Sequence, residues 1–227
     1  MKILNLYAGI GGNRRLWDNE HEVIAVESSQ QIAEVYQKLF PNDKVIVGDA
    51  HQYLLNHYKE FDFIWSSPPC PTHSKLKLTH VKGRGLKAIY PDMGLYQEII
   101  FLKHFFEGKF CIENVISYYN PLIKPQKIGR HYYWCNFNIN EDMKVSSDKI
   151  ADRKTGFGTA GKLAERYGYD LSILNNIKGI DKRQILQNTV NKDVALHIFK
   201  SSLKEKYTQN SLTKTASNKP KVYLKEK

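Results

Sequence analysis

The sequence predicts an α/β fold in which a mostly parallel β-sheet carries helices on both faces. Two observations lead to this class. Short apolar segments that end in glycine, proline or acidic residues recur along the chain, and segments with helical periodicity lie between them. Because parallel strands need long crossovers and are buried on both faces, this alternation is typical of a sheet covered on both sides. The 227 residues, 41% of them hydrophobic, are enough to bury a full core.

The N-terminal part of the predicted sheet alternates strand and helix. Residues 2–8 are an apolar run that ends at glycines, and residues 22–27 are a second such run. A serine cap, an apolar face at helical spacing and a final proline predict a helix over residues 28–41. Two further apolar runs, residues 44–50 and 61–67, predict the next two strands.

The alternation of helix and strand continues after residue 90 and becomes irregular after residue 137. Residues 91–108 have a capping aspartate, an apolar stripe and a terminal glycine, which predict a second helix. Residues 109–115 and the aromatic-rich residues 130–137 are predicted strands. Residues 138–182 are polar and contain glycines, so we expect a small irregular region there. Residues 193–207 have the apolar spacing of a further helix.

The formal net charge of +11 indicates a polyanionic partner such as nucleic acid, with a membrane surface as the weaker alternative. More than half of this charge lies in residues 200–227, which hold eight lysines and two glutamates. That segment is either a solvated flexible tail or a phosphate-binding one.

The composition also indicates where the protein is located and what its cysteines can do. No apolar run reaches the ~20 residues that span a bilayer, and the N-terminal segment lacks the features of a signal peptide, so we expect an intracellular protein. Cys70, Cys111 and Cys135 are odd in number and scattered, which fits neither a disulfide framework nor a zinc site. A reactive cysteine would therefore act alone, and no metal site is predicted.

The predicted strand ends carry the residues expected of a cofactor site, because ligands of such sheets bind outside the carboxyl ends of the strands. Residues 8–13, AGIGGN, follow the first strand, and Glu27 ends the second, where a carboxylate can bind ribose hydroxyls. Asp49 ends the third and can accept an adenine amino group. An adenosine-containing cofactor follows. Arg14 stands where a dinucleotide fingerprint has its third glycine, which weakens the case for NAD.

The next two strand ends carry a cysteine and a glutamate. Cys70 lies among prolines, which fix the backbone, and the segment after it is a basic loop that holds no acid before Asp92. This setting favours a nucleophile presented to a polyanion over an inert buried thiol. Glu113 has apolar neighbours on both sides, which indicates a buried carboxylate that serves as proton donor or hydrogen-bond partner.

Five segments, in this order, closely resemble the DNA (cytosine-5)-methyltransferase family. LYAGIGG is similar to its cofactor loop, PPCPTHS to its Pro-Cys nucleophile motif, and ENV, residues 113–115, to its glutamate motif. PQKIGRH, residues 125–131, is similar to its arginine motif, and QNTV, residues 187–190, to its terminal motif. The chain departs from the family at Pro71, where glutamine is usual, and at Ile128, where the first arginine is missing. The resemblance extends over roughly the first 200 residues.

This resemblance implies a Rossmann-like fold that uses S-adenosylmethionine and methylates C5 of a cytosine flipped out of double-stranded DNA. It implies three catalytic residues: Cys70 adds to C6 of the base, Glu113 holds the N3 and amino edge, and Arg130 contacts the O2 side. The implied cofactor residues are Tyr7, Ala8, Gly9, Gly11, Gly12, Glu27, Asp49, Ala50, Pro69, Asn188 and Val190. The implied nucleic-acid contacts are Ser74, Lys75, Lys77, Lys82, Arg84 and Lys87.

The resemblance divides the chain into four parts. Residues 1–137 are the catalytic and cofactor-binding domain, 138–182 a reduced target-recognition region, 183–206 a segment that returns to the catalytic domain, and 207–227 a basic flexible tail. So short a recognition region predicts a short or relaxed target, or a specificity subunit or cognate restriction enzyme as partner. A cytoplasmic protein of bacterial or phage type is expected. A transfer RNA methyltransferase and a non-catalytic nucleic-acid-binding subunit remain open.

Overall fold

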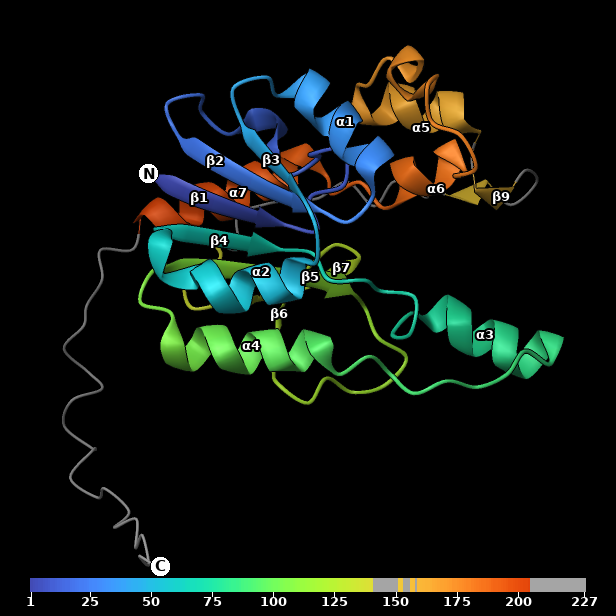
Figure 1. Cartoon of the computed structure of the whole chain (residues 1–227). Helices are drawn as coiled ribbons and strands as arrows, with labels where there is room; N and C mark the ends of the chain where they lie inside the picture. The colour runs from blue at the N-terminus through green and yellow to red at the C-terminus, as the bar shows by residue number, and fades with distance from the viewer. Residues whose placement is uncertain (141–150, 153–155, 158, 205–227) are drawn as a thin grey trace, which may run out of the picture.

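The computed structural model describes residues 1–140, 151–152, 156–157 and 159–204. It forms a seven-stranded sheet with the strand order β3-β2-β1-β4-β5-β7-β6 (Figure 1). β1 to β5 pair in parallel, whereas β7 and β6 are antiparallel at one edge. The predicted mostly parallel sheet is therefore confirmed. The strands are β1 Lys2–Leu6, β2 Glu22–Glu27, β3 Lys44–Val47, β4 Phe63–Ser66, β5 Lys109–Val115, β6 Gln126–Ile128 and β7 His131–Cys135.

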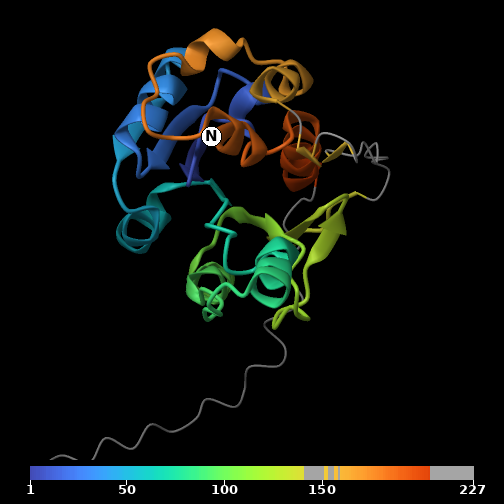
Figure 2. The same ribbon diagram turned by 90° about the vertical axis from the view of Figure 1, so that its right-hand side faces the viewer.

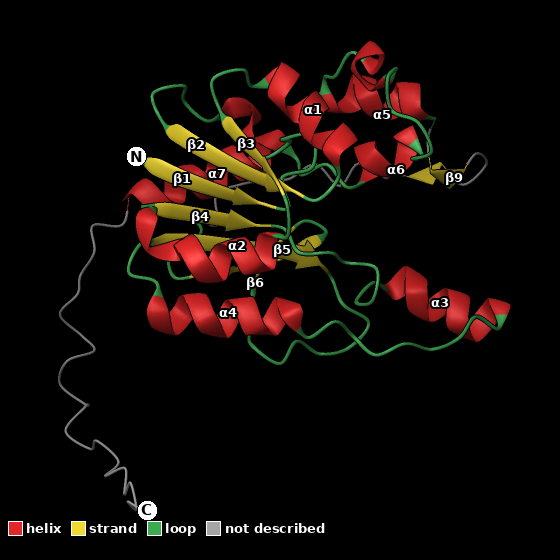
Figure 3. Ribbon diagram, in the orientation of Figure 1, coloured by secondary structure: helices red, strands yellow, loops and turns green. Residues whose placement is uncertain are grey.

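Helices cover both faces of this sheet (Figure 3). Alternate residues of β1 point to opposite faces, so Leu4 and Leu6 join one apolar cluster and Ile3 joins another. The first cluster contains α2 and α4, and the second contains α7. The helices are α1 Gln30–Leu39, α2 Ala50–His57, α3 Lys75–Arg84, α4 Gly94–Phe105, α5 Ala160–Tyr167, α6 Lys182–Gln187 and α7 Lys192–Lys204, with short 3-10 turns η1 Arg14–Leu16, η2 Tyr58–Glu60 and η3 Leu171–Leu174.

The C-terminal helices return to the N-terminal half of the sheet. Figure 2 shows the orange and red segments of α5, α6 and α7 beside the blue N-terminal elements. One apolar cluster joins Ile10 and Val35 to Leu163, Leu174 and Leu186. A two-stranded ladder of β8 Ala151–Asp152 and β9 Gly156–Phe157 precedes α5. The described part of the chain contains no helix long and apolar enough to cross a membrane.

Two segments that the sequence predicted to be irregular are helical, so those predictions were wrong. Residues 75–84, expected as part of a basic loop, form α3, because the Ser74 hydroxyl caps it by accepting from the Lys77 N–H at 3.2 Å and Gly85 ends it at φ +64°. The region expected to be irregular contains α5, which Thr159 caps and Gly168 ends. In both cases the cap and the glycine were visible in the sequence.

Boundaries also differ from expectation at the third strand. β3 ends at Val47 rather than at residue 50, because the Asp49 carboxylate accepts a hydrogen bond from the Gln52 N–H at 3.0 Å and starts α2. The domain divisions, including the role of residues 138–182, stay predictions. The expected basic tail, 207–227, lies outside the described residues, as do residues 141–150, 153–155 and 158 of the recognition region.

Candidate active site

The carboxyl ends of the five parallel strands meet at one edge of the sheet. β1 lies between β2 and β4. The chain therefore continues from β1 to β2 and β3 on one side of it, and then crosses to β4 and β5 on the other side. Such a switch point is where open α/β sheets bind ligands. The Ser67 N–H donates to the Leu6 carbonyl at 3.3 Å, which holds the loop after β4 against the end of β1. Residues 7–13 and 67–74 therefore lie at the same edge of the sheet.

Glu27 ties the loop after β1 to the end of β2. Its Oε2 accepts from the Gly9 N–H at 3.0 Å, and its Oε1 accepts from the Ser29 N–H at 2.9 Å. Gly9 and Gly11 adopt φ of +55° and +76°, a conformation that favours glycine. A side chain at Gly9 would meet no atom within 4 Å, whereas one at Gly11 would collide with Tyr36. Gly9 thus faces open space, and Gly11 permits close packing.

The other predicted cofactor residues lie at the same edge. Asp49 caps α2 and Ala50, which is buried, begins it. Pro69 is exposed in the loop that carries Cys70. The Tyr7 side chain points elsewhere, because its hydroxyl donates to Glu98 on α4 at 2.6 Å. The structure therefore brings the predicted glycine loop together with the carboxylates of Glu27 and Asp49. The Tyr7 side chain instead binds the buried carboxylate of Glu98.

The terminal motif lies directly against the glycine loop although it is distant in sequence. A Cβ atom at Gly12 would collide with the Thr189 side chain and lie 2.5 Å from the Val190 carbonyl oxygen. Asp181 caps α6 by accepting from the Arg183 N–H at 2.9 Å, and this helix delivers Asn188 to the site. The structure thus places Asn188 and Val190 beside the predicted cofactor loop.

Gly12→Ala is expected to separate the loop from the terminal motif, because the new methyl group has no room against backbone atoms. We expect a loss of about 1–3 kcal/mol in the free energy of unfolding, as overpacking typically costs, together with weaker cofactor binding. Urea denaturation and calorimetry would measure the two effects. Gly161→Ala on α5 is the control, since its added Cβ would make only an ordinary contact, 3.9 Å from the Oγ1 of Thr159. Equal stability of the two variants would contradict the prediction.

A buried ion pair lies behind the loop. The Arg14 guanidinium donates to both oxygens of Asp43, at 2.9 and 3.1 Å, and both side chains are almost fully buried. The Tyr36 hydroxyl also donates to Asp43, at 2.8 Å. Sequence reasoning treated Arg14 only as a departure from a glycine pattern. No local signal could have paired it with an aspartate so far away in the chain.

Residues 164–170, AERYGYD, close over the same loop. The Arg15 guanidinium lies 4.3 Å from the Tyr169 ring centroid and donates to the Tyr167 carbonyl at 2.9 Å. The Tyr169 hydroxyl donates to the Ile10 carbonyl at 3.5 Å, and burial raises its pKa to about 12. This segment therefore packs on the loop after β1.

The Cys70 loop is fixed by residues that follow β5. The Asn114 amide donates to the Pro68 carbonyl at 2.9 Å. The Tyr118 N–H donates to the His73 carbonyl at 3.1 Å, and the His73 ring contacts the Tyr119 hydroxyl at 2.6 Å. These bonds hold the end of β4 against the end of β5. Because Glu113 and Asn114 are neighbours in β5, the pinned loop brings Cys70 into the field of the Glu113 carboxylate.

The electrostatics keep the Cys70 thiol protonated in the free protein. Burial, followed by the negative charge of Glu113, raises the pKa of Cys70. Glu113 is 9% exposed, and the His131 Nε2 lies 3.5 Å from its Oε1. Sequence reasoning missed His131, although it directly follows Arg130. The β5–β7 register pairs His131 with Val115, which places exposed Arg130 beside the same strand end.

Iodoacetamide is expected to alkylate Cys70 more slowly than a free cysteine at pH 8, because a raised pKa lowers the thiolate fraction. Glu113→Gln removes the carboxylate charge, so it should speed the reaction and shift its pH profile to lower pH. Mass spectrometry of the Cys70 peptide would follow both rates, and Cys70→Ala would identify the signal. Alkylation at the same rate in wild type and Glu113→Gln at every pH would contradict the assigned cause.

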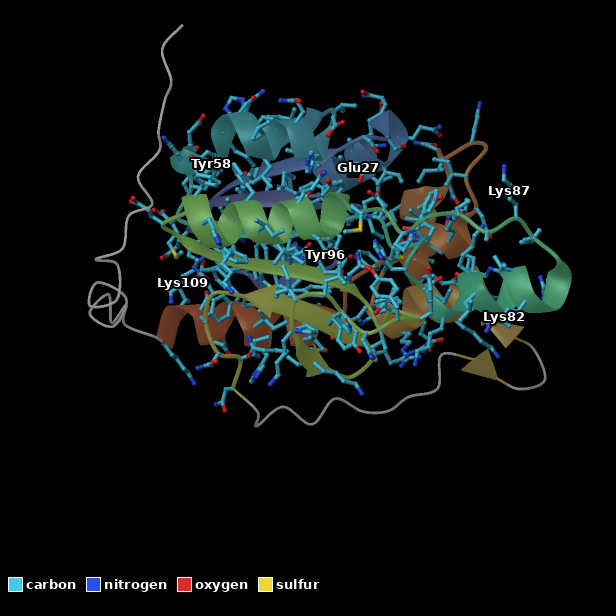
Figure 4. The ribbon with its side chains drawn as sticks, turned by 90° about the horizontal axis from the view of Figure 1, so that it is seen from below. Glu27, Tyr58, Lys82, Lys87, Tyr96 and Lys109 are labelled. Carbon is cyan, nitrogen blue, oxygen red and sulfur yellow. The ribbon has the colours of Figure 1, made fainter. Side chains whose placement is uncertain are left out.

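The predicted nucleic-acid contacts form an exposed arm, residues 74–93, that extends from the site (Figure 1). Figure 4 shows Lys82 and Lys87 at one end of the molecule, opposite Lys109. α3 buries no residue. The end of the arm is tied to its start, because the Asp92 N–H donates to the Thr72 hydroxyl at 2.9 Å. The arm exposes apolar side chains as well as cations, namely Leu76, Leu86, Ile89, Tyr90 and Met93. A cationic surface with exposed apolar side chains suits a nucleic acid.

Known proteins resemble this chain in sequence pattern and in fold. A family model described as C-5 cytosine-specific DNA methylase matches residues 1–116, which include the glycine loop, Cys70 and Glu113. The structure of Entamoeba histolytica methyltransferase EhMeth superposes with a TM-score of 0.56 at 14% identity, covering 90% of this chain and 99% of that one. A mutant of Spodoptera frugiperda DNMT2 gives 0.55 at 15% identity, covering 89% and 99%. These two confirm the Rossmann-like methyltransferase fold. No curated protein sequence matches the chain.

Proposed function

Since the chain belongs to the C-5 cytosine-specific DNA methylase family, we propose that it methylates C5 of cytosine in DNA, with S-adenosylmethionine as methyl donor and a covalent adduct at Cys70. One observation carries the proposal: half-buried Cys70 and buried Glu113 converge at the sheet edge that also holds the glycine loop. A nucleophile, a carboxylate and a cofactor loop at one edge are the parts this reaction requires.

The residues present fit the cofactor. Added side chains at Gly9 and Gly48 would meet no atom within 4 Å, so space is open beside Glu27 and Asp49. A carboxylate has about four acceptor sites. Glu27 accepts from Gly9, Ser28 and Ser29 and therefore keeps about one acceptor site for a ribose hydroxyl. Asp49 keeps an acceptor for an adenine amino group. When bound, S-adenosylmethionine supplies an electrophilic methyl group.

The chain's own residues would activate the base. The Cys70 thiol first gives its proton to a solvent base, and the resulting thiolate adds to C6, forming a C–S bond while the electrons of the C5–C6 double bond shift toward C5 and N3. Glu113 stabilises this state by holding N3 and the exocyclic amine, and Arg130 contacts the O2 side. C5 would then take the methyl group, whose former bonding pair would stay on the sulfur that carried it. A solvent base would remove the C5 proton, and those electrons would re-form the C5–C6 double bond as the C6–S bond breaks. The thiolate is regenerated.

The arm of residues 74–93 is the proposed DNA-binding element. Lys75, Lys82, Arg84 and Lys87 are exposed on it and would contact phosphates. Because C6 is out of reach in a paired duplex, the base must be flipped, and the arm would close over it. A short recognition region further suggests a relaxed target, or a specificity subunit or cognate restriction enzyme as partner.

The test is transfer of labelled methyl from S-adenosylmethionine to unmethylated duplex DNA and, separately, to transfer RNA. We expect label in DNA that hydrolysis releases as 5-methyldeoxycytidine. Label in transfer RNA alone would favour the RNA alternative. No label in either, with S-adenosylmethionine and DNA still bound, would overturn the single-chain enzyme and favour a partner-dependent subunit.

A further inference from the structure

Glu98 is a buried carboxylate at the centre of a hydrogen-bond cluster that sequence reasoning did not foresee. Its side chain is fully buried in α4. Oε1 accepts from the Tyr7 hydroxyl at 2.6 Å and contacts the His51 Nδ1 at 3.1 Å, and Oε2 accepts from the Ser66 hydroxyl at 2.7 Å. Tyr7, His51, Ser66 and Glu98 are called the Glu98 cluster below.

The three partners of Glu98 come from the three elements that build the candidate site. Tyr7 is the first residue of the glycine loop, Ser66 is the last residue of β4 before the Cys70 loop, and His51 is the second residue of α2, the helix that Asp49 caps. One carboxylate therefore contacts the cofactor side and the nucleophile side at once. The helix that carries it, α4, directly follows the exposed arm.

The bond to Tyr7 holds a backbone conformation that tyrosine rarely adopts. Among the described non-glycine residues, only Tyr7 has a positive φ, +53°. Such a conformation persists only where its surroundings impose it. Burial, followed by Glu98, raises the pKa of Tyr7, so the phenol remains a donor. The hydrogen bond to Glu98 raises the pKa of His51.

We propose that Glu98 is a positioning residue for the methyl transfer proposed above: through Tyr7 it sets the glycine loop, and through Ser66 it sets the strand end that carries Cys70. The inference rests on the proposed function. A carboxylate suits this cluster because both of its oxygens are acceptors: Oε1 has two partners, Tyr7 and His51, and Oε2 accepts from Ser66. Glutamine has one acceptor oxygen, and its amide would face a hydroxyl donor.

Three variants separate this role from plain structural support. Tyr7→Phe is expected to weaken S-adenosylmethionine binding about tenfold, the usual effect of a lost charge-assisted hydrogen bond, with kcat at saturation unchanged. Ser66→Ala is expected to lower kcat by a similar factor with the dissociation constant unchanged. Glu98→Gln should do both. Glu34→Gln on α1 is the matched control, because this exposed carboxylate accepts one bond from Gln30 at 3.0 Å.

A second readout needs neither cofactor nor turnover. Amide hydrogen exchange of residues 7–13 in the ligand-free protein should be faster in Glu98→Gln and Tyr7→Phe, and unchanged in Ser66→Ala and Glu34→Gln. Variants that exchange and react as wild type does would overturn the inference, as would three variants whose binding and kcat fall together in proportion to thermal stability. If wild type fails to bind S-adenosylmethionine, the proposed function fails, and the exchange rates still decide whether Glu98 holds the loop.

Discussion

Cys70→Ala is expected to abolish methyl transfer, lowering the rate by on the order of 10⁴-fold or more, as loss of a covalent nucleophile does in other enzymes. The reason is that C5 of cytosine is a poor nucleophile until a thiolate adds to C6. Binding of S-adenosylmethionine and DNA should persist, because Cys70 is a small, half-buried side chain at the edge of the site. Methyl transfer, calorimetry and gel shift would measure the three properties.

A duplex that contains 5-fluorocytosine supplies the matching test of covalency. Fluorine at C5 cannot leave as a proton does, so the C6–S bond formed by Cys70 should persist and give a complex stable to denaturation. Cys70→Ala should give none, and Cys135→Ala, altered at another free cysteine, should behave as wild type. A denaturation-resistant complex in Cys70→Ala would show that another residue is the nucleophile.

Asp43→Ala is expected to lower the free energy of unfolding by about 3–5 kcal/mol, because it leaves a buried guanidinium without its counter-charge. The Arg14 side chain is 3% exposed, so water cannot replace the lost partner. The variant also removes the acceptor of the Tyr36 hydroxyl. Urea denaturation would measure the loss, which should also loosen the glycine loop that Arg14 adjoins.

A double variant distinguishes the lost pairing from lost packing. Arg14→Met combined with Asp43→Leu replaces both charges, and should be less destabilised than Asp43→Ala alone, since no charge is left buried. Glu60→Ala is the control, because its pair with Lys2 is partly solvent-exposed and should contribute little. A double variant as unstable as the sum of both single ones would show that the pair does not interact.

Much of the fold could be predicted because its signals are local. The apolar runs of β1, β2, β4 and β5 and the apolar stripes of α1 and α4 are read within a few residues, and the structure has strands and helices there. The caps of α3 and α5 were equally local. The α3 helix was missed because it buries no residue, so the sequence after its cap shows no apolar stripe. The α5 helix was missed because it is short and buries only Leu163 and Ala164.

The candidate site likewise has a part that could be predicted from the sequence and a part that could not. Gly9, Cys70 and Glu113 follow one another in the order that is typical of the family. Because the carboxyl ends of parallel strands lie at one edge of a sheet, the same order predicts that these three residues lie at one edge. Their roles in catalysis stay predictions. The contacts of Glu98, Arg14 and His131 could not be foreseen, because each depends on which segments pack together and in which register.

The sequence by itself thus determined the type of fold, the edge at which chemistry is placed and the residue types available there. Those properties depend on periodicity and on chain order. Only the tertiary structure decided that Glu98 meets Tyr7 and Ser66, that Arg14 meets Asp43, and that the terminal motif meets Gly12. Buried hydrogen bonds and ion pairs require atoms within about 3 Å, and that closeness is set by the packing of segments far apart in the chain.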